Sequence, residues 1–201
     1  MPLPEARLSY PRRQQYRRLS RAGGALLASI ATGLLGLMTA SSGALSFAGP
    51  LFLAAVGFGL YARHWLVLAG RSQVGARSED DVRRGLVPLR SEGWRLPHSL
   101  AWLGRGDIDS LAIAPSGAAF VIEVKTSRYE NRHLALVREQ AAWLWRFRRW
   151  WCRHGVVPVL CVARARGLHR WEDGVLVVSI DRLVPALHAT RYPIESVALP
   201  F

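Results

Sequence analysis

The sequence feature that most constrains the fold is an uncharged stretch from Ala22 to Ala62, which contains no Asp, Glu, Lys or Arg. A helix needs about 20 apolar residues to cross a bilayer, so this stretch is long enough for two crossings. A Ser-Ser-Gly sequence at 41–43 interrupts it near the middle. We therefore expect two membrane-spanning helices, over about 22–41 and 44–62, joined by a very short turn. This composition excludes a wholly soluble protein.

The flanks of this stretch are basic at both ends. The first 21 residues contain six Arg and one Glu, and Arg63, Arg71 and Arg77 follow the second span. Positive residues next to a span stay on the cytoplasmic side, so we expect both termini in the cytoplasm. Together with the Arg-rich composition, this predicts a multi-pass protein of the bacterial inner (cytoplasmic) membrane. The leading arginines are interpreted as topology determinants in preference to a nucleic-acid-binding arm.

A cleaved signal peptide is the alternative interpretation of the first apolar segment. Its basic leader of 21 residues is long for a signal peptide, and a second apolar segment follows directly. An uncleaved hairpin that contacts the lipid bilayer through 22–62 is therefore favoured. The chain divides accordingly into a basic cytoplasmic arm (1–21), a transmembrane hairpin (22–70), a folded domain (72–190) and a C-terminal tail (191–201).

After residue 70 the pattern changes to short elements with helical or strand periodicity. A Ser followed by acids at 78–81 predicts the start of a helix, and alternating or β-branched segments predict strands. The expected strands are 93–96, 107–113, 119–125, 156–162 and 175–180, the expected long helix is 133–153, and Asp181 is expected to cap a last short helix. This order of elements predicts an α/β fold with a central mixed sheet flanked by helices.

Two of these strands carry acidic residues, which strands usually avoid. Asp109 lies in one, and in the next Glu123 and Lys125 share one face while their apolar neighbours occupy the other. If a tight turn joins the two strands, Asp109 and Glu123 can face each other near one end of the sheet. Converging carboxylates repel each other unless a cation lies between them, and such hard oxygen ligands suit Mg²⁺ or Mn²⁺.

Lys125 is the single Lys among 27 basic residues, since every other one is Arg. A compact ammonium approaches a phosphate oxygen or a bound water differently from a planar guanidinium. An ion pair on a solvated strand face would explain a Glu-x-Lys sequence without any chemistry. The presence of the single Lys two residues after a strand carboxylate favours a chemical role instead.

The segments 106–111 (Gly-Asp-Ile-Asp-Ser-Leu), 115–117 (Pro-Ser-Gly) and 121–125 (Val-Ile-Glu-Val-Lys) resemble the nuclease-related domain (NERD), a branch of the PD-(D/E)XK nuclease superfamily. The upstream segment 75–79 resembles the opening of the first helix in that family. The resemblance covers about residues 72–190. It implies a restriction-endonuclease-like core of order αβββαβ, with a further strand and helix, preceded by the transmembrane hairpin.

Carried over to the matching positions, the resemblance implies that Asp109 and Glu123 hold Mg²⁺ or Mn²⁺. It implies that Lys125 positions the attacking water or stabilises developing charge, and that Glu79 is an outer ligand or orienting group. Gln140 resembles an accessory polar position near the site. The implied activity is metal-dependent hydrolysis of phosphodiester bonds in nucleic acid, with DNA favoured. The alternative is a catalytically inactive module of this fold that binds nucleic acid or a protein partner at the membrane.

Aromatic residues and arginines crowd the segment Trp143–Arg153, at the end of the expected long helix. Trp143, Phe147 and Trp150 have helical spacing, so packing in the core is the first interpretation, with the arginines on a solvated face. Contact with a membrane surface is the second interpretation, and nucleic-acid binding is the third. A membrane adaptor that docks another protein through this segment is a further alternative to the nuclease.

The six His residues have no spacing typical of metal ligands, so a zinc site is not expected. The two Cys residues, Cys152 and Cys161, lie at a helix end and in an apolar strand. They are expected to be buried free thiols, which fits a reducing, cytosolic location for the domain.

Overall fold

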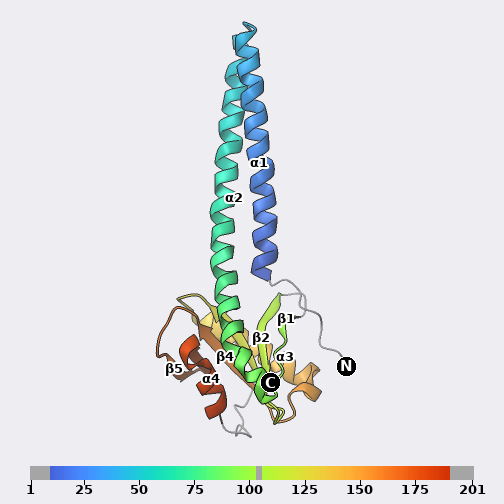
Figure 1. Cartoon of the computed structure of the whole chain (residues 1–201), viewed down its shortest axis with the longest axis vertical. Coiled ribbons are helices and arrows are strands. Elements are labelled where there is room, and N and C mark those ends of the chain that lie inside the picture. The colour runs from blue at the N-terminus through green and yellow to red at the C-terminus, as the bar shows by residue number, and fades with distance from the viewer. Residues whose placement is uncertain (1–9, 103–105, 191–201) are drawn as a thin grey trace. The chain divides into compact units, whose positions relative to one another are not determined.

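The computed structural model of the chain describes residues 10–102 and 106–190. These residues form two units, whose elements can be followed in Figure 1. One unit comprises Pro11–Val74 and is helical. The other contains the described residues from Gly75 onward, together with Tyr10, and holds the sheet.

The helical unit consists of α1 (Tyr10–Ser41) and the larger part of α2 (Leu45–Leu86). Gly43, in the turn between the two helices, has a left-handed φ of 84°, a conformation that suits glycine because it has no Cβ. Both helices are long and apolar enough to cross a membrane. The two apolar helices predicted from the uncharged stretch are therefore present, with the turn where it was predicted.

Small residues let α1 and α2 approach each other closely. The Ser29 hydroxyl donates a hydrogen bond of 2.7 Å to the Ala55 carbonyl. A Cβ added at Gly36 would lie 3.3 Å from the Phe52 ring, so a larger residue would crowd this contact. The outward apolar side chains are largely exposed, as in a helix pair surrounded by lipid.

The prediction that Ser78 opens a new helix is wrong, because α2 continues without a break to Leu86. The Ser-Glu-Asp-Asp sequence is a good helix start, but no proline precedes it after Pro50, and the preceding turns stay helical. Ser78 is buried, and its hydroxyl shares a hydrogen bond of 3.1 Å with the Thr126 hydroxyl. Ser78 thus joins α2 to the segment that follows the third strand.

The second unit contains a mixed six-stranded sheet flanked by helices, so the predicted fold class is confirmed. Its spatial order is β1-β2-β3-β4-β6-β5, with β3, β4 and β6 parallel and the remaining pairs antiparallel. The strands are β1 (His98–Ala101), β2 (Asp107–Ile113), β3 (Ala119–Lys125), β4 (Val156–Val162), β5 (His169–Glu172) and β6 (Val175–Ser179). The remaining helices are α3 (Asn131–Phe147) and α4 (Ile180–Ala189), with 3₁₀ turns η1 (Val87–Glu92) and η2 (Arg149–Trp151).

Each face of the sheet has its own apolar core, because side chains alternate along a strand. The end of α2 and α4 cover one face, where Phe120 and Ile122 of β3 are buried. Helix α3 covers the other face, where Val121 of β3 packs with Leu134 and Val137. Both cysteines are buried free thiols, as predicted, one in each core.

Two strand predictions are wrong in position or number. The segment 93–96 forms only a single bridge, between Arg95 and Ile113, and the strand itself begins at His98. Strand β5 was not predicted, since its sequence is polar and mostly exposed, and it lacks an apolar face. It is one of the two edge strands of the sheet and pairs with β6 across a tight turn at Asp173 and Gly174.

The two downstream helices also differ from expectation at their ends. The predicted helix 133–153 ends at Phe147, where Arg148 leaves the helical conformation and η2 follows. Ser179, not Asp181, is the N-cap residue of α4. Asp181 lies in the first turn of α4 and accepts a hydrogen bond of 3.1 Å from the Gly167 amide. The predicted tail, 191–201, lies outside the described residues.

Candidate active site

The acidic and basic residues of β3 lie on the face of the sheet that α3 covers. Ile122 and Val124 are buried in the opposite core, so the predicted separation of the two faces is confirmed. Lys125 Nζ lies 2.6 Å from Glu123 Oε1 and donates a hydrogen bond to it. Glu123 is only 6% exposed. A buried carboxylate therefore lies in contact with the only Lys of the chain.

Asp109 lies across from Glu123, where β2 and β3 separate. The antiparallel pairing of the two strands ends at Ser110 and Ile122, and the next residues along are Asp109 and Glu123. The Val124 amide donates to Asp109 Oδ2 at 2.8 Å. A carboxylate thus takes the place of a backbone acceptor, and the end of the strand pair opens around it.

The surroundings of Asp109 disfavour its ionised form. Burial raises the pKa of Asp109 well above its usual range, and the charges of Glu123 and Glu79 raise it further. The Val124 hydrogen bond and the Lys125 charge oppose this increase without cancelling it. The site therefore concentrates negative charge in a place that favours a compensating cation.

Gln140 reaches this site from α3. It is 1% exposed, and its Nε2 atom donates to Glu123 Oε2 at 3.3 Å. Its Oε1 atom is buried and has no hydrogen-bond partner. A buried acceptor left without a partner is costly, so it marks a place where a donor or a cation would be stabilising.

Glu79 belongs to the last turns of α2 and is 5% exposed. Its charge acts on Asp109, so the structure brings this helix acid near the strand carboxylates. The Arg83 guanidinium lies 3.5 Å from Glu79 Oε2. The five candidate residues thus lie together at one end of the sheet, between α2 and α3: Asp109, Glu123, Lys125, Gln140 and Glu79.

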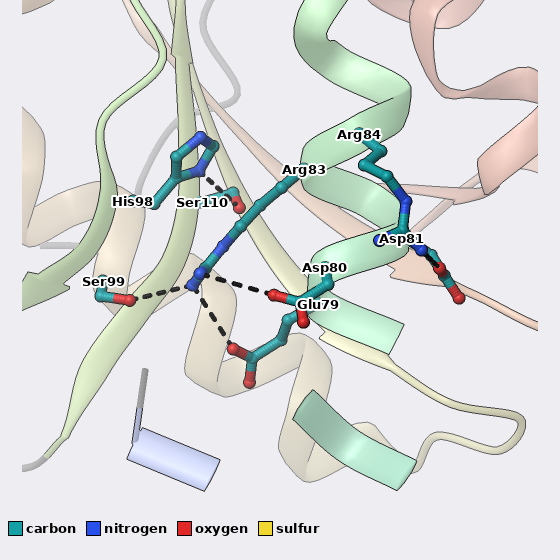
Figure 2. A network of polar contacts seen from close by, with 8 residues as sticks. All are labelled: Glu79, Asp80, Asp81, Arg83, Arg84, His98, Ser99 and Ser110. Carbon is teal, nitrogen blue, oxygen red and sulfur yellow. Dashed lines mark hydrogen bonds and ion pairs between the residues drawn. The ribbon is translucent and has the colours of Figure 1, made fainter. Parts of the chain in front are cut away.

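A polar network beside Glu79 was not predicted from the sequence (Figure 2). Arg83 donates a hydrogen bond of 2.9 Å to the Ser99 hydroxyl, and His98 Nδ1 lies 3.1 Å from the Ser110 hydroxyl. Burial and the nearby arginines Arg83 and Arg90 lower the pKa of His98 to about 4. In the sequence, this network is signalled only by the spacing of four residues between Glu79 and Arg83. That spacing is common between charged residues on helix surfaces, so it does not single out a site.

The donor set fits a hard divalent cation. Among the residues that the structure describes, no group of three or more His, Cys, Asp or Glu side chains could hold a metal ion. Mg²⁺, however, is usually bound through one or two carboxylates and retains several waters. Asp109 and Glu123 supply two carboxylates, and the unpartnered Gln140 Oε1 could accept from such a water. The residues present therefore suit Mg²⁺ or Mn²⁺ better than Zn²⁺.

The core-packing interpretation of the Trp–Arg segment is only partly correct. Trp143 packs against the α3-side core, but Phe147 and Trp150 are 50% and 53% exposed. The helix ends at Phe147, so Trp150 does not continue the buried stripe. Arginines lie over the exposed rings, with Arg146 5.5 Å from the centre of Phe147 and Arg148 5.4 Å from that of Trp150. This segment thus presents an Arg–aromatic surface.

Residues 74–164 match the family model described as nuclease-related domain, NERD. This segment is a nuclease-related domain. The match extends from α2 into the segment after β4, and it includes every residue of the site described above. No curated protein matches the chain, and no solved structure matches it.

The NERD match agrees with the resemblance found in the sequence and with the α/β core. It indicates a nuclease-related function. The two apolar helices that precede the NERD domain are consistent with a membrane anchor.

Proposed function

We propose that the NERD domain is a nuclease that uses a divalent metal ion to hydrolyse phosphodiester bonds, with DNA as the favoured substrate. The observation that carries this proposal is the contact of Glu123 with Lys125 beside Asp109, inside a segment that matches a nuclease-related family. Two carboxylates and one ammonium at the end of a sheet form a compact set for phosphate chemistry.

Asp109 and Glu123 would hold the ion, Mg²⁺ or Mn²⁺. When bound, such an ion supplies Lewis-acid polarisation of a phosphate oxygen and lowers the pKa of water. The Val124 amide holds Asp109 Oδ2, and Gln140 Nε2 holds Glu123 Oε2, so each carboxylate has one oxygen fixed by the fold. These hydrogen bonds orient the ligand set before substrate arrives.

Lys125 would act on the reacting phosphate. Its side chain is 24% exposed, whereas that of Glu123 is 8% exposed, so the ammonium lies at the solvent side of the pair. There it can orient the attacking water or stabilise the negative charge that develops on the phosphate. Glu79 would act as an orienting group behind Asp109, since it is buried and paired with Arg83.

The apolar hairpin would anchor the NERD domain in the bacterial inner membrane. Helices α1 and α2 are long enough to cross, and arginines flank both apolar segments. By the positive-inside rule, both flanks would be cytoplasmic. The nuclease would therefore act on nucleic acid at the cytoplasmic surface of the membrane.

The test is a cleavage assay with the full chain in nonionic detergent micelles. Labelled single-stranded DNA, double-stranded DNA and RNA are incubated with Mg²⁺, with Mn²⁺ or with EDTA. We expect metal-dependent cleavage, fastest with DNA, that is lost in Lys125→Ala and Glu123→Gln. Metal-independent binding of nucleic acid without cleavage, unchanged by Lys125→Ala, would instead identify an inactive binding module.

A further inference from the structure

Arg83 connects the helix that carries Glu79 to the strand next to Asp109. Its guanidinium lies 3.5 Å from Glu79 Oε2 and 3.9 Å from Asp80 Oδ1, both on α2. The same group donates a hydrogen bond of 2.9 Å to the Ser99 hydroxyl, on β1 (Figure 2). An ordinary ion pair between side chains three or four residues apart joins two neighbouring turns of a single helix. Arg83 also joins the helix to the sheet.

Ser99, the residue of β1 that Arg83 contacts, has an unusual backbone conformation. Ser99 has a φ of 53°, which is left-handed and uncommon for a residue other than glycine. Its side chain cannot relax into solvent, because Ser99 is 5% exposed. Such a conformation costs on the order of 1–3 kcal/mol and persists only where surrounding contacts hold it. The Arg83 hydrogen bond is a contact that holds it.

Ser99, with its left-handed backbone, lies directly beside the carboxylate site. Pairing of β1 with β2 places His98 opposite Ser110 and Leu100 opposite Ile108, so Ser99 falls opposite Asp109. Continuing across the sheet, Asp109 falls opposite Glu123. The position that Arg83 contacts is thus in the same row as both proposed metal ligands.

The charges in this region are paired from two sides. Lys125 pairs with Glu123, and Arg83 pairs with Glu79. The charges of both acids act on Asp109, which accepts a hydrogen bond from a backbone amide. A buried carboxylate that loses its cation is strongly disfavoured. A Lys at position 83 would keep the positive charge but would lack the planar fork that contacts two acids and a hydroxyl together.

We propose that Arg83 is a positioning residue of the carboxylate site. Its guanidinium holds Glu79 and the left-handed backbone at Ser99 in one arrangement, and this fixes where Asp109 lies relative to Glu123. The inference rests on the proposed function, because it assumes that these two carboxylates bind a divalent cation. Arg83 itself neither binds the cation nor contacts the substrate in this account, since its side chain is 21% exposed and already has three partners.

The experiment measures binding of Mn²⁺ alone, with no nucleic acid present. The full chain in nonionic micelles is titrated with Mn²⁺, and the free ion is followed by electron paramagnetic resonance. Binding that disappears in Glu123→Gln is assigned to the site. The variants are Arg83→Lys, which keeps the charge, and Ser99→Ala, which keeps Arg83 and removes its strand partner. Arg84→Lys is the matched control, because Arg84 is the next residue of the same helix, pairs with Asp81, and has a side chain that is 72% exposed.

We expect Arg83→Lys to weaken site-specific Mn²⁺ binding about 10- to 100-fold, the usual effect of removing a group that orients metal ligands. Ser99→Ala should weaken it in the same direction by a smaller factor, and Arg84→Lys should leave it unchanged. Wild-type Mn²⁺ affinity in both Arg83→Lys and Ser99→Ala would overturn the inference, even if both variants melt at lower temperature. That result would mean a purely structural role.

The outcomes also separate this inference from the nuclease proposal. If the wild type binds Mn²⁺ but cleaves nothing, the nuclease proposal fails, and the affinity of Arg83→Lys still decides the role of Arg83. If the wild type shows no Glu123-dependent Mn²⁺ binding, the inference is overturned together with the metal site. An increase in KM for nucleic acid in Arg83→Lys, at unchanged Mn²⁺ affinity, would identify a phosphate contact and overturn the positioning role.

Discussion

The Val124 amide donates its hydrogen to Asp109 Oδ2 at 2.8 Å, where a regular antiparallel ladder would use a backbone carbonyl. This contact lets the strand pair open while the Val124 amide keeps an acceptor. It also fixes one oxygen of an acid whose surroundings otherwise disfavour its charge. The backbone of β3 thus holds this acid in place, while Lys125 pairs with Glu123 and Arg83 pairs with Glu79.

Asp109→Asn should stabilise the metal-free protein at neutral pH. The raised pKa of Asp109 means that its ionisation opposes folding. This penalty is absent below the ordinary pKa of an Asp and grows as the pH rises toward the folded-state pKa. Asn keeps the volume and an oxygen that can accept from Val124. We expect the melting temperature to rise by a few degrees at pH 7 without divalent metal, while Mn²⁺ binding is lost.

The contrary result for this variant would be equally informative. A lower melting temperature in EDTA would mean that the ionised Asp109 stabilises the fold. The comparison should be repeated at a pH well below 3.8, the ordinary pKa of an Asp, where both states of the wild type hold the proton and the difference between wild type and variant should shrink.

His98 should make the NERD domain sensitive to mild acid. Its pKa of about 4 in the folded state lies below the value of 6.5 for a free His, so the unfolded state takes up the proton first. Stability should therefore be complete above pH 6.5 and should fall as the pH drops toward 4. The pKa difference corresponds to about 3 kcal/mol, which solvent screening of this partly exposed ring reduces to about 2 kcal/mol. Urea unfolding at pH 7 and at pH 4.5 measures this loss.

The matched variant for this prediction is His98→Gln, which keeps a polar group for Ser110 but does not titrate in this range. We expect its stability to depend less on pH than that of the wild type between pH 6.5 and 4.5. Parallel curves for the two proteins would show that His98 does not carry the effect.

Lys125→Arg should fail to replace Lys125, although it conserves the charge. A guanidinium is planar and larger than an ammonium, so it cannot occupy the same point between Glu123 and a phosphate oxygen. We expect kcat to fall about 100- to 1000-fold in Lys125→Arg and in Lys125→Ala. The control is Arg132→Ala, since Arg132 belongs to an exposed pair with Glu130. Full activity in Lys125→Arg would show that only the positive charge matters.

The Arg–aromatic surface is expected to contact an anionic membrane. Phe147 and Trp150 are half exposed, and arginines lie over both rings, a combination that suits the headgroup region of a bilayer. In anionic nanodiscs, we expect the backbone amides of 145–151 to be protected from hydrogen exchange. The triple variant Arg146→Glu, Arg148→Glu and Arg149→Glu should lose this protection. DNA binding measured in nonionic micelles should be unchanged. Loss of DNA binding with no change in exchange would assign the surface to nucleic acid.

Much of the fold could be predicted because its signals are local. The uncharged stretch predicted two apolar helices, and the alternation in 119–125 placed Glu123 and Lys125 on one face. Strand β5 was not predicted because an edge strand needs no apolar face. The helix start predicted at Ser78 was wrong because a residue that favours an N-cap does not end a helix that already extends through it. Tertiary contacts overrode the local preference at both places.

The candidate site was predictable to a smaller extent. The acids and Lys125 stand out by type and spacing. The unpartnered Gln140 oxygen and the left-handed backbone at Ser99 instead depend on how α3 and β1 pack. Arg83 is one of many arginines in this sequence, so composition could not single it out. Its role is visible only through contacts between residues far apart in the chain, such as the hydrogen bond to Ser99.

The most direct test of the central claim is single-turnover cleavage of labelled DNA by the full chain, with Mg²⁺ or Mn²⁺ and with EDTA, for the wild type, Lys125→Ala and Arg132→Ala. The account predicts that wild type and Arg132→Ala cleave only when metal is present, and that Lys125→Ala cleaves at least about 100-fold more slowly. Equal cleavage by Lys125→Ala, or no cleavage by a folded wild type that binds Mn²⁺, would contradict it.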